Sequence, residues 1–564
     1  MKEKLKKNWL IIAIVLIFFL SRFLAFGQMY HQDEYKWVMI VDPSYGLNYE
    51  SDHPPLVGFL YHIIGVVFGY DHLRLLPIII SSLLLLGIFF LTSKLYSRKA
   101  AWWTVGILFI SVYNFVASTQ VDIDGALLPL ASIIAIYCFY RIDFSNIRNK
   151  KQRLWITAFI ISIIFGFLIK LSFALVLGAL ITEYCIRRKP SKKLVLVSVG
   201  IFMGITAILA IMVLIMKYVL NIEHATRFLQ NVTKFGFLNF ASRDYFQVLF
   251  LGTKSLVLAS PILLGLYILV FSSSEYIRRY RFWLILLLYN ILFYFVVFDF
   301  TNRTIERYMM FLIIPSSIIT GSILADKWRL KIKDMSVRFY GIVTFFVVIT
   351  FIPFFYNYAI LPLYPKNVYI DKLKSFDLNF LIPITGGSGP IGFYVLVSYV
   401  VIGFMISIGS VVIYRLMKQE SHKKIALAVF IFSALAYNLT LNEEYLFGKI
   451  YGSVNKVAYA VTNEVINNPK IDKVITYYDI AGYELNDSKK YARRFYVAPM
   501  FAQSNIGKFS EYKGYYSVVD FPLIDPNSIY WKYLQSCRTV FETQDKNING
   551  YIFDCKNGNR KLFN

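Results

Sequence analysis

Long apolar segments recur along most of the chain, and they limit its possible folds more than any other feature. Thirteen segments are apolar enough to cross a bilayer as α-helices, each of which needs roughly 20 residues. Only 16% of the 564 residues are charged and 57% are apolar, so a soluble fold could not bury the apolar surface. The composition predicts a polytopic membrane protein. The predicted spans are 9–26, 75–93, 101–118, 125–140, 155–169, 171–186, 194–220, 248–271, 282–299, 308–325, 338–356, 391–414 and 425–441.

The apolar stretch 155–186 decides the topology, because Lys170 interrupts it. If the stretch were one helix, the basic segments RRYR, KWRLKIK and RLMKQESHKK would all face outward, against the positive-inside rule. Two short helices with Lys170 at a tight outer turn keep the 29 Lys and Arg of the inner segments on one side. The basic start, MKEKLKK, then lies inside, before an uncleaved first span. Thirteen spans place the C-terminus outside the cytoplasmic membrane.

The excess of basic residues admits two interpretations. The chain has 59 Lys and Arg against 34 Asp and Glu, a net charge of +25. In a soluble protein this balance would suggest nucleic acid as a partner. Because the basic residues gather in the predicted inner loops, membrane topology explains them, and we expect no nucleic-acid partner.

The chain becomes polar from about residue 442, which predicts a transmembrane domain over 1–441 and a small extracytoplasmic α/β domain over 442–564. Residues 454–467 have a helical pattern, and KVITYYDI, YYSVVDF and GYIFDC are typical of strands. Cys537 and Cys555 lie 18 residues apart around a polar turn. A hairpin could bring the two sulfurs together in an oxidising compartment, and two buried thiols are the alternative.

Charged side chains collect in the predicted outer turns. Asp33 and Glu34 follow the first span, and Asp122 and Asp124 lie between the third and fourth. Carboxylates suit general-base chemistry on a hydroxyl or amine, and Lys or Arg suits a phosphate. Each residue alone also has an ordinary structural interpretation, as a helix cap, a loop hydrogen-bonder or an interfacial anchor. The order and shared membrane face of the residues favour a site. Its basic members are Lys170 and Arg307, and His53 lies in the SDHPPL segment.

The motifs around these residues occur in a characteristic order. DEYKW at 33–37 is followed by HPPL at 53–56 and by LRLLPIIISSLLLLGIFFLTSKLYSRKAAWW at 73–103; VDIDGALLPL at 121–130, GFLIK at 166–170 and ERYMMFLIIP at 306–315 complete it. This order resembles the GT-C glycosyltransferases, specifically the protein O-mannosyltransferases and the bacterial lipid A aminoarabinose transferase. The resemblance covers residues 9–186 and, more weakly, 300–325. One departure is that Leu follows Lys170, where the family often has Lys-Gly or Lys-Tyr.

The resemblance implies an inverting glycosyltransferase with about 13 spans that uses a polyprenyl-phosphate-linked hexosyl or pentosyl donor at the outer face. In such enzymes a first-loop carboxylate deprotonates the acceptor, which is a glycan, lipid or protein of the cell envelope. Carried over to this chain, the catalytic residues are Asp33 as base, with Glu34 supporting it, and Asp122. The implied donor-binding residues are Lys170, Arg307, His53 and Tyr308, and the acceptor-binding residues are Asp124 and Tyr35.

Two other functions are compatible with a multi-span chain. A lipid-linked oligosaccharide flippase or transporter would place more charges inside the spans than this chain does. A surface glycan polymerase or ligase also uses outer-face lipid carriers, without needing an early Asp-Glu pair. The sequence does not decide the sugar, the acceptor or the need for a divalent cation. Donors with one phosphate can leave with Lys or Arg alone, whereas pyrophosphate donors more often need a metal.

Overall fold

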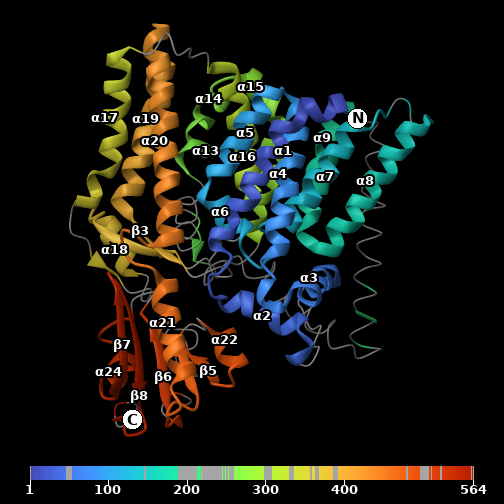
Figure 1. Ribbon diagram of the computed structural model, residues 1–564. Coiled ribbons are helices and arrows are strands. Elements are labelled where there is room, and N and C mark those ends of the chain that lie inside the picture. Colours follow the sequence, from blue (N-terminus) through green and yellow to red (C-terminus); the bar gives the residue numbers. More distant parts are fainter. Residues whose placement is uncertain are drawn as a thin grey trace.

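A computed structural model describes most of the chain. The protein is mostly helical, with two small sheets at one end of a helical bundle (Figure 1). The N-terminus lies at the opposite end of the bundle from the C-terminal sheet. The described residues are 2–45, 54–144, 148–188, 260–297, 308–328, 336–355, 359–361, 367–384, 392–477, 481–495, 511–520 and 524–559, with a few single positions between them.

The bundle contains seven described helices that are long and apolar enough to cross a membrane, or eight if a bent pair counts as one span. The predicted span 194–220 and much of 248–271 lie outside the described residues, so the count of thirteen stays a prediction. The bundle helices are α1 (Lys2–Arg22), α4 (Leu75–Leu95), α5 (Arg98–Ile110), α6 (Val112–Ser118), α7 (Leu127–Arg141), α8 (Lys150–Ile169), α9 (Ala174–Arg188), α13 (Pro261–Gly265), α14 (Tyr267–Phe271), α15 (Ser274–Leu292), α16 (Met310–Lys327), α17 (Val337–Phe351), α19 (Val397–Leu416) and α20 (Glu420–Phe447).

The predicted span 101–118 is broken in the structure. Helices α5 and α6 meet at an angle of 71°. Ser111 lies between them in an extended conformation, and its hydroxyl accepts a hydrogen bond from the Asn114 amide as the N-cap of α6. The pattern of apolar residues continues through this break, so hydropathy alone did not reveal it.

The division of 155–186 into two helices is confirmed. Helix α8 ends at Ile169, Lys170 is extended, and a short turn, η4 (Leu171–Phe173), leads into α9. Gly166 permits this turn, because a Cβ at Gly166 would lie 2.5 Å from the ring of Phe173. The GFLIK motif therefore combines a close packing contact with an exit from the helix.

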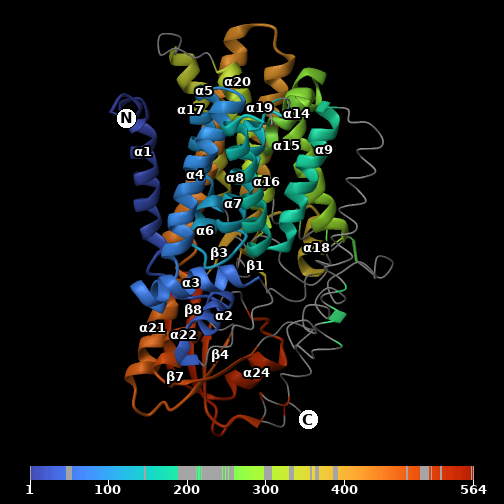
Figure 2. The same cartoon turned by 90° about the vertical axis from the view of Figure 1, so that its right-hand side faces the viewer.

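Two short helices of the first loop lie between the bundle and the C-terminal domain (Figure 2). These are α2 (Gln32–Val41) and α3 (Pro55–Phe68). A three-stranded sheet also lies at this end, and its order is β1 (Ala359–Ile360), β2 (Phe380–Ile384), β3 (Phe393–Leu396), with α18 (Asn367–Lys374) packed on it. Strands β1 and β2 are parallel, whereas β2 and β3 are antiparallel.

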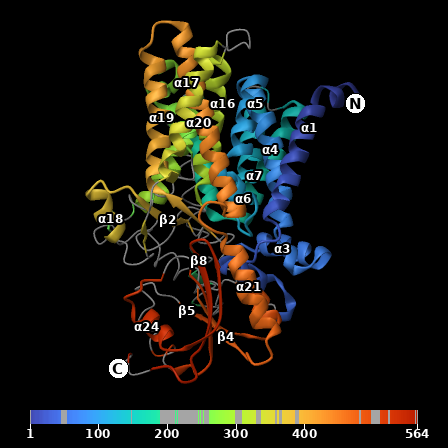
Figure 3. The ribbon, with the colours of Figure 1, turned by 60° about the vertical axis from the view of Figure 1, so that its left-hand side comes forward.

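The C-terminal region forms a mixed five-stranded sheet with helices against it (Figure 3). The predicted helix 454–467 and the three predicted strands are present, as α21 (Val454–Asn467), β4 (Val474–Tyr477), β6 (Tyr515–Val519) and β8 (Ile548–Asp554). Cys537 and Cys555 form a disulfide, so the bridged alternative is the one observed. The strand order is β5-β4-β6-β8-β7, with β5 at Tyr491–Phe495 and β7 at Arg538–Asp545; α22 (Gly482–Asp487) and α24 (Ile529–Gln535) complete the domain.

Candidate functional site

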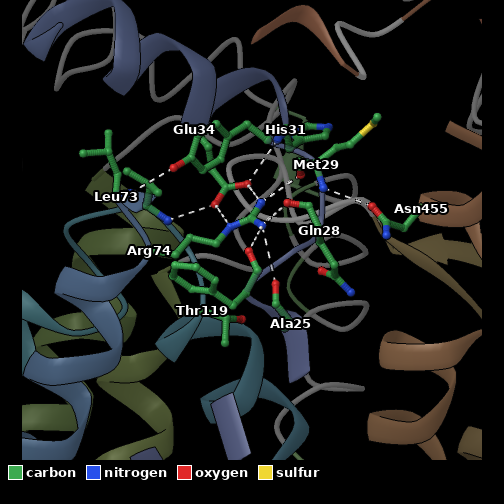
Figure 4. Close-up of polar contacts among 12 residues, drawn as sticks. Ala25, Gln28, Met29, His31, Glu34, Leu73, Arg74, Thr119 and Asn455 are labelled. Carbon is green, nitrogen blue, oxygen red and sulfur yellow. Dashed lines mark hydrogen bonds and ion pairs between the residues drawn. The ribbon is translucent and has the colours of Figure 1, made fainter. Parts of the chain in front are cut away.

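Arg74 and Glu34 form a buried ion pair where the first loop meets the bundle (Figure 4). The Arg74 Nε donates to Glu34 Oε1 at 2.9 Å, and Nη2 donates to Oε2 at 2.7 Å. The side chains are 1% and 0% exposed. A planar guanidinium matches a carboxylate in this two-bond geometry, which gives direction as well as attraction.

The remaining donors of Arg74 bind the chain that leaves α1. Nη1 donates to the carbonyls of Phe26 and Gln28, with a longer contact to that of Ala25, and Nη2 donates to the carbonyl of Met29 at 2.8 Å. Four carbonyls within five residues converge on one guanidinium and fix the path of the backbone. Arg74 therefore sets where α2 begins.

Glu34 extends this network to two further segments. Its Oε2 accepts from the amide of His31, which caps α2, and its Oε1 accepts from the amide of Val121 at 3.1 Å. We call Arg74, Glu34 and the groups that they bind the Arg74 hub. It joins the end of α1, the start of α2 and the acidic turn before α7. The LRLLP motif contained Arg74, but no local pattern connected it with Glu34.

Asp33 is next to the hub but has a more open environment. It lies in the first turn of α2, and its Oδ1 accepts from the Lys36 ammonium at 2.7 Å. The Asp33 side chain is 18% exposed and that of Lys36 is 45% exposed. The Asp33 carboxylate therefore keeps access to solvent beside the enclosed hub.

The acidic turn between α6 and α7 is buried. Asp122 and Asp124 are 8% and 6% exposed. The Asp122 carbonyl accepts from the hydroxyl of Tyr61 in α3, which ties the turn to the first loop. Gly125 fits here because a Cβ at Gly125 would lie 2.4 Å from the Ala117 carbonyl oxygen.

The Lys170 ammonium donates to both carboxylate oxygens of Asp124, at 2.7 Å to Oδ1 and 2.6 Å to Oδ2. The Lys170 ammonium lies 4.5 Å from the centre of the Tyr308 ring, in the geometry of a cation–π contact. We call Lys170, Asp124 and Tyr308 the lysine cluster. The structure brings together three of the residues that the sequence singled out, from three different segments that the sequence predicts to be outer.

A cavity adjoins the lysine cluster. Asp124, Ser172 and Tyr308 line it, and most of the lining is apolar. The ring of Tyr294 stacks on that of Tyr308, with 5.2 Å between the ring centres. Tyr294 belongs to η6 (Phe293–Val297), a π-helical turn that continues α15. π-Helical turns are rare and frequently occur at functional sites. The other lining residues come from α7, α9, α15 and α16, including Ile133, Ile136, Val176, Trp283, Asn290 and Pro315.

The C-terminal domain contacts the backbone of the first loop. The Met29 amide donates to Asn455 Oδ1 at 3.0 Å, and the hydroxyl of Tyr459 donates to the Gly27 carbonyl at 2.6 Å. Both contacts come from α21. Burial raises the pKa of Glu484 in α22, which also accepts from the backbone of Tyr30. The same backbone segment is thus held by Arg74 from one side and by the C-terminal domain from the other.

Tyr35 has an environment of packed rings. It is 4% exposed and lies edge-on to Tyr45 and Tyr491, at 6.1 and 6.2 Å between ring centres. Tyr483 of α22 also packs against it. Such packing favours a structural contribution to the junction of α2 with the C-terminal domain over a sugar-stacking surface.

Two of the residues singled out from the sequence lie outside the described residues. These are His53 of the HPPL motif and Arg307 of the ERY motif.

Among the described residues, no group of three or more His, Cys, Asp or Glu side chains has a geometry that could hold a metal ion.

Comparison with known proteins identifies the fold. The profile of the dolichyl-phosphate-mannose-protein mannosyltransferase family matches residues 52–216. The crystal structure of ArnT from Cupriavidus metallidurans bound to undecaprenyl phosphate superposes with a TM-score of 0.55 at 12% identity, covering 97% of this chain and 98% of that one. This chain has the GT-C fold. The apo structure of the same ArnT gives a TM-score of 0.53 with the same identity and coverage. Among curated protein sequences, none matches the chain.

These comparisons confirm the resemblance that the motif order indicated. The profile match includes HPPL, the acidic turn and Lys170, so it overlaps the residues on which the resemblance was based. The ArnT likeness extends over almost the full chain, including the C-terminal sheet region. The protein is a multi-pass membrane protein with a GT-C architecture.

Proposed function

We propose that this protein is an inverting glycosyltransferase that moves a sugar from a polyprenyl-phosphate-linked donor to an acceptor at the outer face of the cell membrane. The acceptor is an envelope glycan, lipid or protein. The description of the matching family names a dolichyl-phosphate-linked mannose donor, and the ArnT crystal contains undecaprenyl phosphate. Both carriers are polyprenyl phosphates, which supports a donor of this class.

The observation that carries the proposal is the position of the lysine cluster at the edge of a mostly apolar cavity. A polyprenyl-phosphate sugar has an anionic phosphate attached to an apolar chain. Lys170 supplies the cation, and the cavity between α7, α15 and α16 supplies apolar surface beside it. An ammonium has three donors, so Lys170 can bind Asp124 and still donate to a phosphate oxygen.

The reaction then divides between two groups. Asp33 takes the proton from the acceptor hydroxyl or amine as the acceptor atom bonds to the anomeric carbon. The bond from that carbon to the phosphate oxygen breaks at the same time, and polyprenyl phosphate leaves with one more negative charge. Lys170 stabilises this developing charge, which makes its position a contribution to the transition state. Attack from the face opposite the phosphate inverts the anomeric centre.

Glu34 and Asp122 have positioning roles in this proposal. Both carboxylate oxygens of Glu34 already accept from Arg74 and from backbone amides, so Glu34 holds Asp33 in place. The acidic turn carries Asp122 and Asp124 together, and the Tyr61 contact keeps this turn against the first loop. Asp124 orients Lys170.

Turnover in detergent tests the proposed activity. Purified protein is incubated with a short-chain polyprenyl-phosphate hexose or pentose and an envelope extract, and free polyprenyl phosphate is measured by mass spectrometry. We expect acceptor-dependent release that is lost in Asp33→Asn. Movement of an intact lipid-linked sugar across vesicles without release of polyprenyl phosphate would instead establish a flippase.

The face of the membrane is tested by the C-terminal disulfide. A membrane-impermeant thiol reagent is applied to intact cells, with and without prior reduction. Labelling at Cys537 and Cys555 only after reduction would support an outer C-terminal domain and an outer active site. If labelling requires opened cells, the proposed orientation is wrong.

A further inference from the structure

Helix α18 ends in a turn that carries a phenylalanine where helices usually have glycine. The Phe376 amide donates to the Leu373 carbonyl at 3.2 Å, and the Asp377 amide donates to the Lys372 carbonyl at 2.9 Å. This pair of bonds places Phe376 in the left-handed conformation, with a φ of 55°. A Cβ is strained in that conformation, which explains the usual preference for glycine.

Phe376 is also displayed to the outside of the protein. Its side chain is 86% exposed, and that of Phe355 at the end of η9 (Ile352–Phe355) is 85% exposed. Helix α18 has an apolar core that does not include Phe376. This core contains Leu361, Tyr369, Phe380 and Val397, all of which are buried. Phe376 therefore combines a strained backbone conformation with a solvent-exposed aromatic ring.

The two exposed rings belong to segments, α18 and η9, that pack against the start of a candidate membrane span. The apolar core of α18 includes Val397, the first residue of α19, and the neighbouring Phe354 ring lies 4.7 Å from Tyr399. Helix α19 is one of the helices that are long and apolar enough to cross a membrane. Figure 3 shows α18 at the edge of the bundle, beside the end of α19. If α19 crosses the bilayer, its first turn is where the span would leave the apolar region for the polar one.

We propose that Phe376 and Phe355 insert into the boundary between lipid headgroups and acyl chains, so that α18 is an interfacial anchor beside α19. Helices that lie in the interface bury Trp, Phe and Leu side chains at this depth. Lys372 is paired with Asp377, and Asp371 offsets Lys374, so insertion depends on the apolar rings and does not require anionic lipid. The anchor holds the β1–β3 sheet against the membrane surface.

Spin labels at three positions test the anchor in the full-length protein reconstituted into lipid nanodiscs. The free cysteines Cys138 and Cys185 are first replaced by alanine. Single cysteines are then introduced by Phe376→Cys, Phe355→Cys and, as the matched control on the exposed side of α18, Asp371→Cys. Collision of each nitroxide with oxygen, which enters lipid, is compared with collision with a soluble nickel chelate.

The anchor predicts a several-fold higher ratio of oxygen to nickel collisions at 376 and 355 than at 371. The ratio should be equal in neutral and in partly anionic nanodiscs. A label at 376 that collides with nickel as readily as the label at 371 would overturn the proposal, because it would be in water. Shielding from both reagents would also overturn it, since a protein partner would then cover the ring. Phe355→Cys gives the same decision if Phe376→Cys fails to fold.

Discussion

The Arg74 hub and the lysine cluster each contain a buried cation–carboxylate pair that contacts the acidic turn before α7, and the surroundings of the two pairs differ. In the hub, Arg74 and Glu34 are 1% and 0% exposed, and further backbone groups bind both side chains. In the cluster, Lys170 and Asp124 are 16% and 6% exposed, and an apolar cavity adjoins them. An enclosed pair that forms hydrogen bonds with several segments of the chain holds those segments together. A pair whose carboxylate lines a cavity can also bind a ligand.

The difference between the pairs separates stability from activity. Removing one member of an enclosed pair leaves an uncompensated buried charge, so the cost falls on folding. Replacing both members of the pair beside the cavity with neutral side chains should affect folding less and should remove a contact to the ligand. The four predictions below test this separation in order of decreasing effect.

Loss of Arg74 should give the largest effect. Arg74→Met should destabilise the protein by roughly 3–5 kcal/mol, because Glu34 would remain charged and buried. The measurement is the apparent melting temperature in detergent. The double variant Arg74→Met/Glu34→Gln is the control, and it should recover part of the loss because the buried charge is gone. Equal melting temperatures for Arg74→Met and wild type would show that the hub does not stabilise the fold.

Asp33→Asn should reduce transfer by roughly 10²–10⁴-fold, the scale of a general base, while the melting temperature stays near wild type. The amide keeps the shape of the side chain and loses its basicity. Lys36→Ala is the matched control, since it removes the partner of Asp33 at an exposed pair that contributes little. If Asp33→Asn turns over normally, the base is another carboxylate.

Removal of the Lys170 charge should lower kcat/KM for the donor by roughly 10- to 100-fold, the value of one charge-assisted hydrogen bond. The double variant Lys170→Gln/Asp124→Asn tests this without leaving Asp124 charged and unpaired. Donor titration at saturating acceptor is the measurement. Unchanged kinetics in the double variant would place the donor phosphate away from Lys170.

We expect the smallest effect from a change at Asp520. This residue has a third kind of carboxyl environment, buried and without a cation partner among the described residues. Its Oδ1 accepts from the Ile524 amide, and none of the described residues forms an ion pair with it. Burial raises the pKa of Asp520 to about 7, and the Ile524 hydrogen bond opposes this rise. The unfolded pKa is about 3.9, so the folded state binds the proton more tightly. The stability that this carboxyl provides below pH 4 is therefore lost as the pH rises to 7.

Asp520→Asn should remove this pH dependence from the C-terminal domain. We expect the variant to gain stability relative to wild type between pH 5 and pH 8, as followed by thermal unfolding. Asp472→Asn, at an exposed position, is the control and should show no such gain. Parallel pH profiles for wild type and Asp520→Asn would show that Asp520 is not a buried carboxyl of this kind.

The sequence by itself determined the membrane-spanning character and the two helices on either side of Lys170. It also determined one helix and three strands of the C-terminal region, α21, β4, β6 and β8. Each of these depends on consecutive residues: apolar runs, basic loops and alternating strands. The motif order also indicated the GT-C fold.

Only the tertiary structure decided which charges meet. Arg74 is 40 residues from Glu34, and Lys170 is 46 residues from Asp124. Any of the outer cations could have neutralised any of the outer carboxylates on the basis of sequence. The choice depends on which pairs the packed helices remove from water, because a charge buried without its partner costs far more than an exposed one. That choice comes from contacts between distant helices, which no local pattern contains.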